Sequence, residues 1–174
     1  MIDIRDAAAG DLGAILAIYN DAVINTTAVY DYEPRTMEAQ RKWLAAKYEQ
    51  KLPVLVAEQD GAVVGFASYG PFRPWPAYLH TIENSVYVAP DRRGAGIGAA
   101  LLGPLVVRAR GGGYRTMVAG IDASNAASLR LHAKFGFVQV GHFREVGWKF
   151  DRWLDLVFMQ KMLRERVTAN PSIA

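Results

Sequence analysis

The sequence predicts an α/β protein of the α+β kind, in which helices cover both faces of one mixed sheet. Two patterns support this expectation. Short apolar runs typical of strands are interspersed with segments whose apolar residues recur at helical spacing. Their predicted order is β-α-α-β-β-β-α-β-α-β-β, which gives about seven strands and about four helices. Strands interrupted by helices in this way favour a mixed sheet that is buried on both sides.

The first half of this order rests on periodicity and capping. A short strand is expected at 2–5, where apolar and polar residues alternate. Asp11 is expected to cap a helix that carries Leu12, Ile15, Leu16, Ile18 and Tyr19 on its apolar side. Thr36 is expected to cap a second helix, which runs to about Gln50 and has Trp43, Leu44 and Tyr48 as its apolar side.

A hairpin follows the second helix. Strands are expected at 53–58 and 63–69, with Asp60-Gly61 as the turn, because both central positions of such a turn favour positive φ. The segment 70–76 contains three prolines, which remove backbone donors and fix φ, so irregular structure is expected there.

The second half of the chain is punctuated by glycines. A strand at 82–88 precedes a helix from 96 to about 110, and the glycines at 111–113 end that helix. A strand at 114–121 leads to a helix that starts at Ser124 or Asn125 and ends at Gly136. Strands at about 137–144 and 148–160 complete the sheet.

Composition narrows the class of function. The chain has 174 residues, 51% of them hydrophobic, which fits one domain with an ample core. The net charge of +3 is too small and too scattered to indicate nucleic-acid binding, although it suits an anionic ligand. No stretch approaches the ~18–20 apolar residues of a membrane span, and the first residues do not resemble a signal peptide. We therefore expect a cytoplasmic protein that binds neither nucleic acid nor membrane.

The absence of cysteine excludes disulfides, thiolate nucleophiles and cysteine-based zinc sites. It fits a reducing compartment.

The segment 92–98, Arg-Arg-Gly-Ala-Gly-Ile-Gly, is the strongest functional signal. It joins an expected strand to an expected helix. The first turn of a helix leaves backbone N–H groups without partners, and the helix dipole makes that end positive. Glycines let an anion come close to these groups, and two arginines add positive charge. The pattern predicts a pyrophosphate site.

Two common phosphate loops do not match this segment. A Walker loop ends in Gly-Lys-Ser/Thr, whereas Gly98 is followed by two alanines. The dinucleotide fingerprint requires G-x-G-x-x-G and an acidic residue about 20 residues further on, and both are missing. A glycine-rich turn that only begins a helix remains an alternative.

The remaining match is a resemblance to the GNAT family of N-acetyltransferases. Residues 93–98 fit the family's acetyl-CoA motif R/Q-x-x-G-x-G/A, and residues 125–137 fit its later segment N-x-x-S/A-x-x-(Tyr or His)-x-x-x-G-F. The resemblance covers nearly all of 1–163. It implies a single acetyltransferase domain at 1–166, with a mostly antiparallel GNAT-type sheet, followed by a loose tail at 167–174.

Within that family the chain resembles the phosphinothricin and methionine sulfoximine acetyltransferase branch, most clearly at 18–23, 80–88 and 147–156. This resemblance implies a homodimer that acetylates the α-amine of a small amino-acid analogue. Acetyl-CoA would be the co-substrate. A thioester is already activated, so no metal is required. A protein amine as acceptor, or a CoA-binding sensor without turnover, are the alternatives.

Glu83 is the predicted general base, because the resemblance places it on the strand before the glycine loop. A solvated or ion-paired carboxylate is the alternative. His132 is predicted to protonate or hydrogen-bond the departing thiolate, or else to pack in the core. Asn125 is predicted to bind the pantetheine chain or to serve as a helix cap. The resemblance assigns acetyl-CoA binding to Val86, Tyr87, Val88, Arg93, Gly94, Ala95, Gly96, Ile97, Gly98, Ala99, Asn125 and Ser128.

The aromatic, proline-stiffened segment 72–78 is predicted to wall the acceptor pocket, with Arg73 pairing to a substrate carboxylate and Trp75 packing on a methyl group. A surface loop packed on the core is the alternative. The predicted acceptor-binding residues are Phe72, Arg73, Trp75, Pro76, Ala77, Tyr78, Ser85 and Tyr87. Lys149, Arg152 and Asp155 are expected on a solvated or ion-paired strand face.

Overall fold

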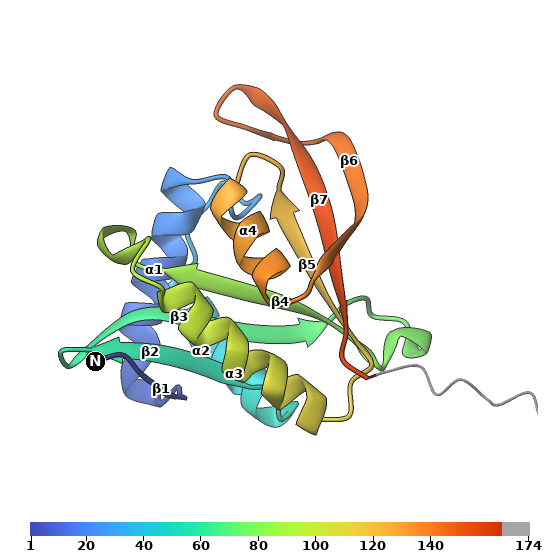
Figure 1. Ribbon diagram of the computed structural model, residues 1–174. Coiled ribbons are helices and arrows are strands. Elements are labelled where there is room, and N and C mark those ends of the chain that lie inside the picture. Colours follow the sequence, from blue (N-terminus) through green and yellow to red (C-terminus); the bar gives the residue numbers. More distant parts are fainter. Residues whose placement is uncertain (165–174) are drawn as a thin grey trace, which may run out of the picture.

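The computed structural model describes residues 1–164 and contains one seven-stranded sheet flanked by helices (Figure 1). The strands are β1 (Asp3–Asp6), β2 (Val54–Gln59), β3 (Ala62–Pro71), β4 (Thr81–Val88), β5 (Thr116–Asp122), β6 (Val138–Lys149) and β7 (Arg152–Met162). Within the described residues the α-helices are α1 (Leu12–Asn25), α2 (Met37–Glu49), α3 (Ile97–Gly111) and α4 (Ala126–Lys134). Both the predicted element order and the mixed sheet are confirmed.

The sheet runs in the order β1-β2-β3-β4-β5-β7-β6. Every neighbouring pair is antiparallel except β4 and β5. That parallel pair needs a crossover, which α3 supplies. Because β7 inserts between β5 and β6, the last hairpin extends one edge of the sheet and projects beyond the rest of the molecule in Figure 1.

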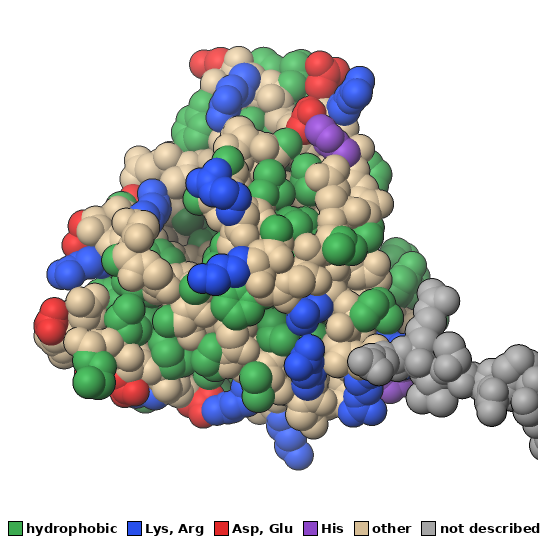
Figure 2. All heavy atoms as spheres, in the orientation of Figure 1, with side chains coloured by type: hydrophobic (Ala, Val, Ile, Leu, Met, Phe, Trp, Pro, Cys, Tyr) green, Lys and Arg blue, Asp and Glu red, His purple; other side chains and the backbone are tan. Residues whose placement is uncertain are grey.

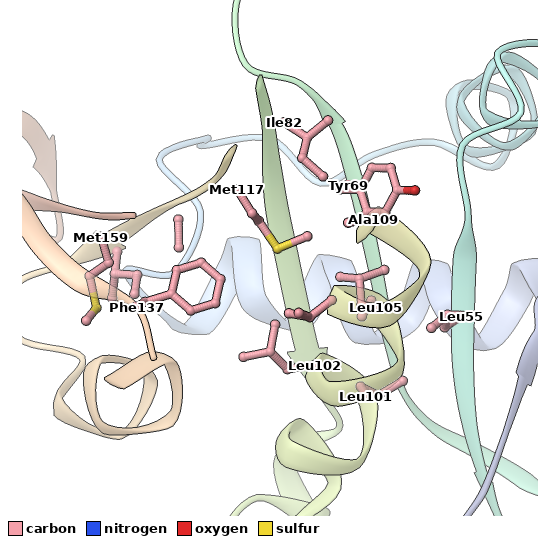
Figure 3. Packing of buried hydrophobic residues seen from close by; sticks show 14 of the residues in the cluster. Leu55, Tyr69, Ile82, Leu101, Leu102, Leu105, Ala109, Met117, Phe137 and Met159 are labelled. Carbon is pink, nitrogen blue, oxygen red and sulfur yellow. The ribbon is translucent and has the colours of Figure 1, made fainter. Parts of the chain in front are cut away.

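Helices α1 and α2 cover one face of the sheet, and α3 and α4 cover the other. On the α1–α2 face, Ile15, Ile18 and Leu44 pack against side chains of β2 and β3. On the opposite face, α3 contributes Leu101, Leu102, Leu105 and Ala109 to a larger cluster (Figure 3). This cluster includes Leu55, Tyr69, Ile82 and Met117 from four successive strands of the sheet. Burial of these apolar surfaces fixes the position of β4, which carries the predicted site.

The predicted caps differ in outcome. Thr36 precedes α2 and its Oγ1 accepts a hydrogen bond from the N–H of Ala39, as expected. Asp11 precedes α1 but makes no capping bond to that helix. Its carboxylate instead accepts from the Ala8 N–H and pairs with Arg5 at 2.7 Å. Arg5 on β1 donates to both carboxylate oxygens of Asp11, at 2.7 and 2.9 Å, and this bidentate ion pair holds the carboxylate away from the first turn of α1.

Two predicted boundaries are wrong. Gly70 and Pro71 are not irregular, because β3 continues through them and pairs them with Glu83 and Ile82. The last hairpin turns at Phe150-Asp151 rather than near 145–147, so Trp148 belongs to β6. Both turn residues have positive φ, a conformation that the sequence does not announce because neither is glycine.

No helix within residues 1–164 is long and apolar enough to cross a membrane. The C-terminal segment for which we predict a loose tail lies outside the described residues.

Candidate active site

Strands β4 and β5 run side by side for a short distance and then separate. Their pairing covers Thr81 to Glu83 on β4 and Thr116 to Val118 on β5. Just beyond it, the side-chain amide of Asn84 donates to the carbonyl of Val118. The remaining residues of β4 keep their partners on β3, so their edge toward β5 has no strand beside it. An extended ligand arm can pair with such an edge as an added strand does.

A cavity of about 690 Å³ opens at this separation. We call it the cofactor cavity. Its wall contains the end of β4, the start of α3, the first turns of α4 and the end of α1. Figure 2 shows the surface hollowed between α1 and α4, with Lys and Arg side chains gathered around the opening. The predicted acetyl-CoA residues in its wall are Val86, Tyr87, Val88, Arg93, Gly94, Gly96, Ile97, Gly98, Ala99, Asn125 and Ser128.

The glycine loop has the backbone that an anion site requires. Gly94 and Gly96 both have φ of +83°, which side chains other than glycine rarely adopt. Gly96 precedes α3 without a capping side chain, so the first-turn N–H groups face the cavity without a competing side-chain acceptor. Gly98 has another role: a Cβ there would lie 3.1 Å from Cδ2 of Leu131, so this glycine lets α3 approach α4. Ala95 does not line the cavity.

Three arginines line the cofactor cavity. Arg92 and Arg93 come from the glycine loop, and Arg93 also pairs with Asp21 at 2.7 Å. Arg152 comes from β7, where its side chain is exposed as expected, and it also lines the cofactor cavity, which the sequence did not indicate. The net positive charge, the open first turn of α3 and the free edge of β4 fit a ligand that carries phosphates on an extended arm.

Asn125 caps α4: its Oδ1 accepts from the N–H of Ser128 at 3.0 Å. It also lines the cofactor cavity. The capping alternative is therefore observed, while binding of a pantetheine chain stays a prediction.

Glu83 lies on β4 with its side chain about one-third exposed. Burial raises the pKa of its carboxyl group, and the nearby Arg73 opposes that rise, as does a hydrogen bond from the Gly120 backbone. Arg73 Nη1 lies 3.7 Å from Glu83 Oε2. A carboxyl group whose pKa lies above its usual range suits proton transfer near neutral pH.

A second cavity of about 170 Å³ lies on the α1–α2 face of the sheet. We call it the side cavity. Glu83, Ser85 and Tyr87 contribute to it from β4, and Arg35, Trp43 and Lys47 contribute from α2 and the segment before it. Tyr87 lines the cofactor cavity as well. Strand β4 therefore forms a wall common to both cavities, with Glu83 on the side cavity.

His132 is buried, with 3% of its surface exposed. Its Nδ1 lies 2.8 Å from the carbonyl oxygen of Ser128, and its Nε2 lies 3.1 Å from Oδ1 of Asn84. The ring also packs edge-on against Phe137. It lines a small cavity of about 70 Å³ beside Ser85, Val86 and Tyr87. Both ring nitrogens thus have partners, and a role at the departing thiolate stays a prediction.

The segment 72–78 is an aromatic cluster against β7. Phe72 packs edge-on against both Tyr78 and Phe158, and the Arg73 guanidinium stacks on the Phe72 ring. Trp75 is 62% exposed. Of the predicted acceptor residues, Ser85 and Tyr87 line the side cavity, whereas Phe72, Arg73, Trp75, Pro76, Ala77 and Tyr78 line none of the three cavities.

Lys149 corrects another expectation. It is not on a solvated face: it is 4% exposed, and its ammonium group donates to the carbonyl oxygens of Val23, Thr26 and Val29. These carbonyls belong to the end of α1 and the loop after it, which form part of the cofactor cavity. No local pattern indicates this role, because the partners lie more than 100 residues away.

The model of the acetyltransferase (GNAT) family matches residues 15–137. A protein of Pseudomonas paraeruginosa named L-methionine sulfoximine/L-methionine sulfone acetyltransferase is 50% identical over 90% of this chain and 92% of its own length. This chain belongs to the GNAT acetyltransferase family. It is therefore an acetyltransferase, as the glycine loop and the Asn125 segment indicate.

Two solved structures of relatives extend the comparison. A phosphinothricin acetyltransferase from Sinorhizobium meliloti in complex with acetyl-CoA is 37% identical, with a TM-score of 0.93, and the match covers 98% of this chain and 93% of that one. A ribosomal-protein-alanine N-acetyltransferase from Brucella melitensis is 51% identical, with a TM-score of 0.90, over 92% of this chain and 99% of that one. Their names point to two classes of acceptor.

Among residues 1–164, no three His, Asp or Glu side chains converge in a group that could hold a metal ion.

Proposed function

We propose that this GNAT acetyltransferase transfers the acetyl group of acetyl-CoA to the α-amine of a small amino-acid analogue such as methionine sulfoximine, methionine sulfone or phosphinothricin. One observation carries the proposal: β4 lines the cofactor cavity through Val86–Val88 and the side cavity through Glu83 and Ser85. The amine of an acceptor bound in the side cavity would therefore be separated from a thioester in the cofactor cavity only by strand β4. The names of the Pseudomonas and Sinorhizobium relatives support this acceptor class.

In this proposal transfer is direct, within a ternary complex. The backbone groups of Val86, Tyr87 and Val88 hold the pantetheine arm and the thioester carbonyl at the free edge of β4. Glu83 accepts, through water, the proton that the α-amine loses as its nitrogen bonds to the acetyl carbon. The carbon–sulfur bond then breaks, and the thiolate that leaves takes up a proton. We assign this last proton to His132, and its support is the small cavity that His132 shares with Ser85, Val86 and Tyr87.

Arg73 is proposed to bind the acceptor's α-carboxylate. Its Nη1 lies 3.7 Å from Oε2 of Glu83, so its side chain already reaches a carboxylate at the edge of the side cavity. A carboxylate adjacent to the reacting amine would find the same guanidinium group, in a bidentate geometry that arginine favours. Trp75, from the same segment, is exposed enough to close over a methyl group.

The proposal includes a homodimer in the cytoplasm, where acetyl-CoA is made and used. The β6–β7 hairpin exposes a set of large apolar side chains: Val138, Val140, Phe143, Val146, Trp148, Phe150 and Trp153. Exposed apolar surface of this extent on a projecting hairpin favours burial against a second copy. Sedimentation equilibrium tests it: a monomer at micromolar concentration would contradict this part of the proposal.

A thiol-release assay with acetyl-CoA tests the reaction. We expect turnover with methionine sulfoximine, methionine sulfone and phosphinothricin, and mass spectrometry should find the acetyl group on the α-nitrogen. The name of the Brucella relative favours one second candidate, the N-terminal amine of a protein. A peptide that begins with alanine belongs in the same panel. Turnover of the peptide without turnover of any small amino acid would replace the first proposal with the second.

A further inference from the structure

The side cavity contains two cations that no part of the proposed mechanism uses. Arg35 precedes α2, and Lys47 lies near its end. Neither forms an ion pair with a carboxylate among residues 1–164, whereas Arg73 and Arg93, which serve the two sites described above, each have an acidic partner. Positive charge without a protein counterion, placed in a cavity, suits the binding of an oxygen-rich ligand group.

Arg35 is held rigidly. Its Nη1 donates to Oε1 of Gln40, a fully buried side chain, at 2.9 Å. Its guanidinium carbon lies 3.9 Å from the centre of the Tyr19 ring. Its backbone exchanges two hydrogen bonds with the side chain of Asn20, at 2.8 and 2.9 Å. A group fixed in this way loses little conformational entropy when it binds a ligand.

Lys47 is a cation with little water around it. Its ammonium group donates to the carbonyl oxygen of Tyr69 at 2.6 Å, which uses one of its three hydrogens. It also lies where a Cβ on Gly70 would be 3.2 Å away, and Gly70 is the direct partner of Glu83 across β3 and β4. Burial and the charge of Arg35 lower the pKa of Lys47 to about 8. An oxygen ligand would supply a further partner for this ammonium group.

Aromatic rings form the rest of this end of the cavity. Trp43 and Phe66 contact each other edge-on at 6.2 Å between ring centres, and Phe66 stacks on Tyr87 at 5.0 Å. The cavity therefore offers apolar walls for methylene and methyl groups together with two cations for oxygen atoms. Its volume, about 170 Å³, is that of a compact side chain rather than of a peptide.

We propose that Arg35 and Lys47 bind the oxygen atoms of the acceptor's tetrahedral sulfur or phosphorus group and thereby determine specificity for such acceptors. The inference rests on the proposed function and adds the residues that select the acceptor. The α-carboxylate is left to Arg73, which approaches Glu83 from the segment after β3, whereas Arg35 and Lys47 approach from the α2 side. An acceptor with its amine at Glu83 would thus have its two polar ends bound by different elements.

Three acceptors that differ at one end test the proposal. Phosphinothricin carries an anionic phosphinate, methionine sulfone carries two uncharged oxygens, and methionine carries none, while all three share the amine and carboxylate. In Arg35→Met and Lys47→Met, we expect kcat/KM to fall by about 10- to 100-fold for phosphinothricin. The loss should be smaller for the sulfone and less than about threefold for methionine. Arg35→Lys, which keeps the charge without the planar fork, should lie between wild type and Arg35→Met.

The pattern across acceptors decides the outcome. An equal loss for all three acceptors, or no loss for any, would overturn the proposal, because the two cations would then bind the carboxylate, serve the structure or do nothing. Arg41→Met is the matched control: it removes an exposed cation from the same helix and should leave all three values unchanged. Unchanged melting temperatures would separate specificity from folding.

A binding measurement keeps this inference distinct from the proposed function. Isothermal titration calorimetry, with phosphinothricin added to the enzyme saturated with CoA, measures the affinity for the acceptor without turnover. If the wild type acetylates none of the acceptors, the proposed function fails. The inference is then supported by tight binding that weakens in Arg35→Met, and it is overturned if phosphinothricin does not bind the wild type.

Discussion

Nε2 of His132 lies 3.1 Å from Oδ1 of Asn84, and this contact joins α4 to β4 beside the separation of β4 from β5. The chain of hydrogen bonds ends in a backbone carbonyl on each side: Asn84 donates to Val118, and Nδ1 of His132 faces Ser128. Carbonyls only accept, so Nδ1 carries a proton, and Nε2 must also carry one if it donates to Asn84. Burial opposes this cationic state by lowering the pKa of His132.

Asn84→Asp should favour the protonated, cationic form of His132. A carboxylate at Nε2 stabilises the imidazolium, so we expect the pKa of His132 to rise by about one to three units. An NMR titration of the ring proton signals measures this directly. Asn84→Leu removes the acceptor and should lower the pKa instead. Equal pKa values in the two variants would show that the contact does not influence the ring.

Glu83→Gln should reduce kcat by about 10²- to 10⁴-fold near neutral pH, because the amide cannot accept the proton of the amine. Affinity for CoA, measured by calorimetry, should stay unchanged, since Glu83 does not line the cofactor cavity. Glu58→Gln is the control, as this carboxylate pairs with Arg5 on β1. Wild-type turnover in Glu83→Gln would exclude the base role.

Arg73→Met should change both the affinity for the acceptor and the pH profile. Loss of the proposed carboxylate ligand should raise the KM of the acceptor about 10-fold or more. Arg73 also opposes the rise in the pKa of Glu83, so its removal raises that pKa further. A base works when deprotonated, so the acidic limb of kcat/KM should move to higher pH. An unchanged KM and an unmoved limb would contradict both roles.

Gly120→Ala should displace the carboxylate of Glu83, the proposed base, without changing that residue. A Cβ at this position would lie 3.0 Å from Oε1 of Glu83, so the carboxylate must move by a few tenths of an ångström. We expect kcat to fall severalfold, up to about tenfold, because reactivity depends steeply on position. Gly10→Ala is the control, since a Cβ at Gly10 would have no neighbouring atom within 4 Å. Crystallography of the variant would verify the displacement.

Lys149→Met should destabilise the fold by about 2–4 kcal/mol, because it leaves the carbonyls of Val23, Thr26 and Val29 without their donor. The same loop borders the cofactor cavity, so the KM of acetyl-CoA should rise as well. Lys42→Met removes a lysine whose side chain is 76% exposed, and it should cost about 0.5 kcal/mol or less. Urea denaturation compares the two variants, and similar losses would refute the buried role.

The sequence was most informative where local chemistry decides the backbone. Asp60-Gly61 predicted a turn with positive φ at both positions, and Thr36 predicted a cap; both are observed. The last turn was misplaced because Phe150 and Asp151 adopt positive φ without being glycine. Gly147, the nearest glycine, serves packing instead: a Cβ there would lie 2.7 Å from the ring of Tyr30.

Contacts between distant elements account for what sequence reasoning missed. Trp43 was expected only as part of an apolar helix face, and nothing distinguished Arg35 and Lys47 from surface cations. The three side chains gather around one cavity because α2 packs over β3 and β4. Arg152 likewise reaches the cofactor cavity through the position of the β6–β7 hairpin, which no local pattern fixes.

Lys149 joins the β6–β7 hairpin to the end of α1, and this contact bears on the order in which the protein acquires its structure during synthesis. The walls of the cofactor cavity include Ala22 and residues 25–28 from the first part of the chain, and Phe150 and Arg152 from its last hairpin. During translation the N-terminal wall leaves the ribosome long before its partner. Contacts of such sequence separation form late. A nascent chain that stops before Lys149 would have its glycine loop but would lack the cavity wall that Phe150 and Arg152 form, so we expect the complete cofactor cavity only after the last hairpin is made.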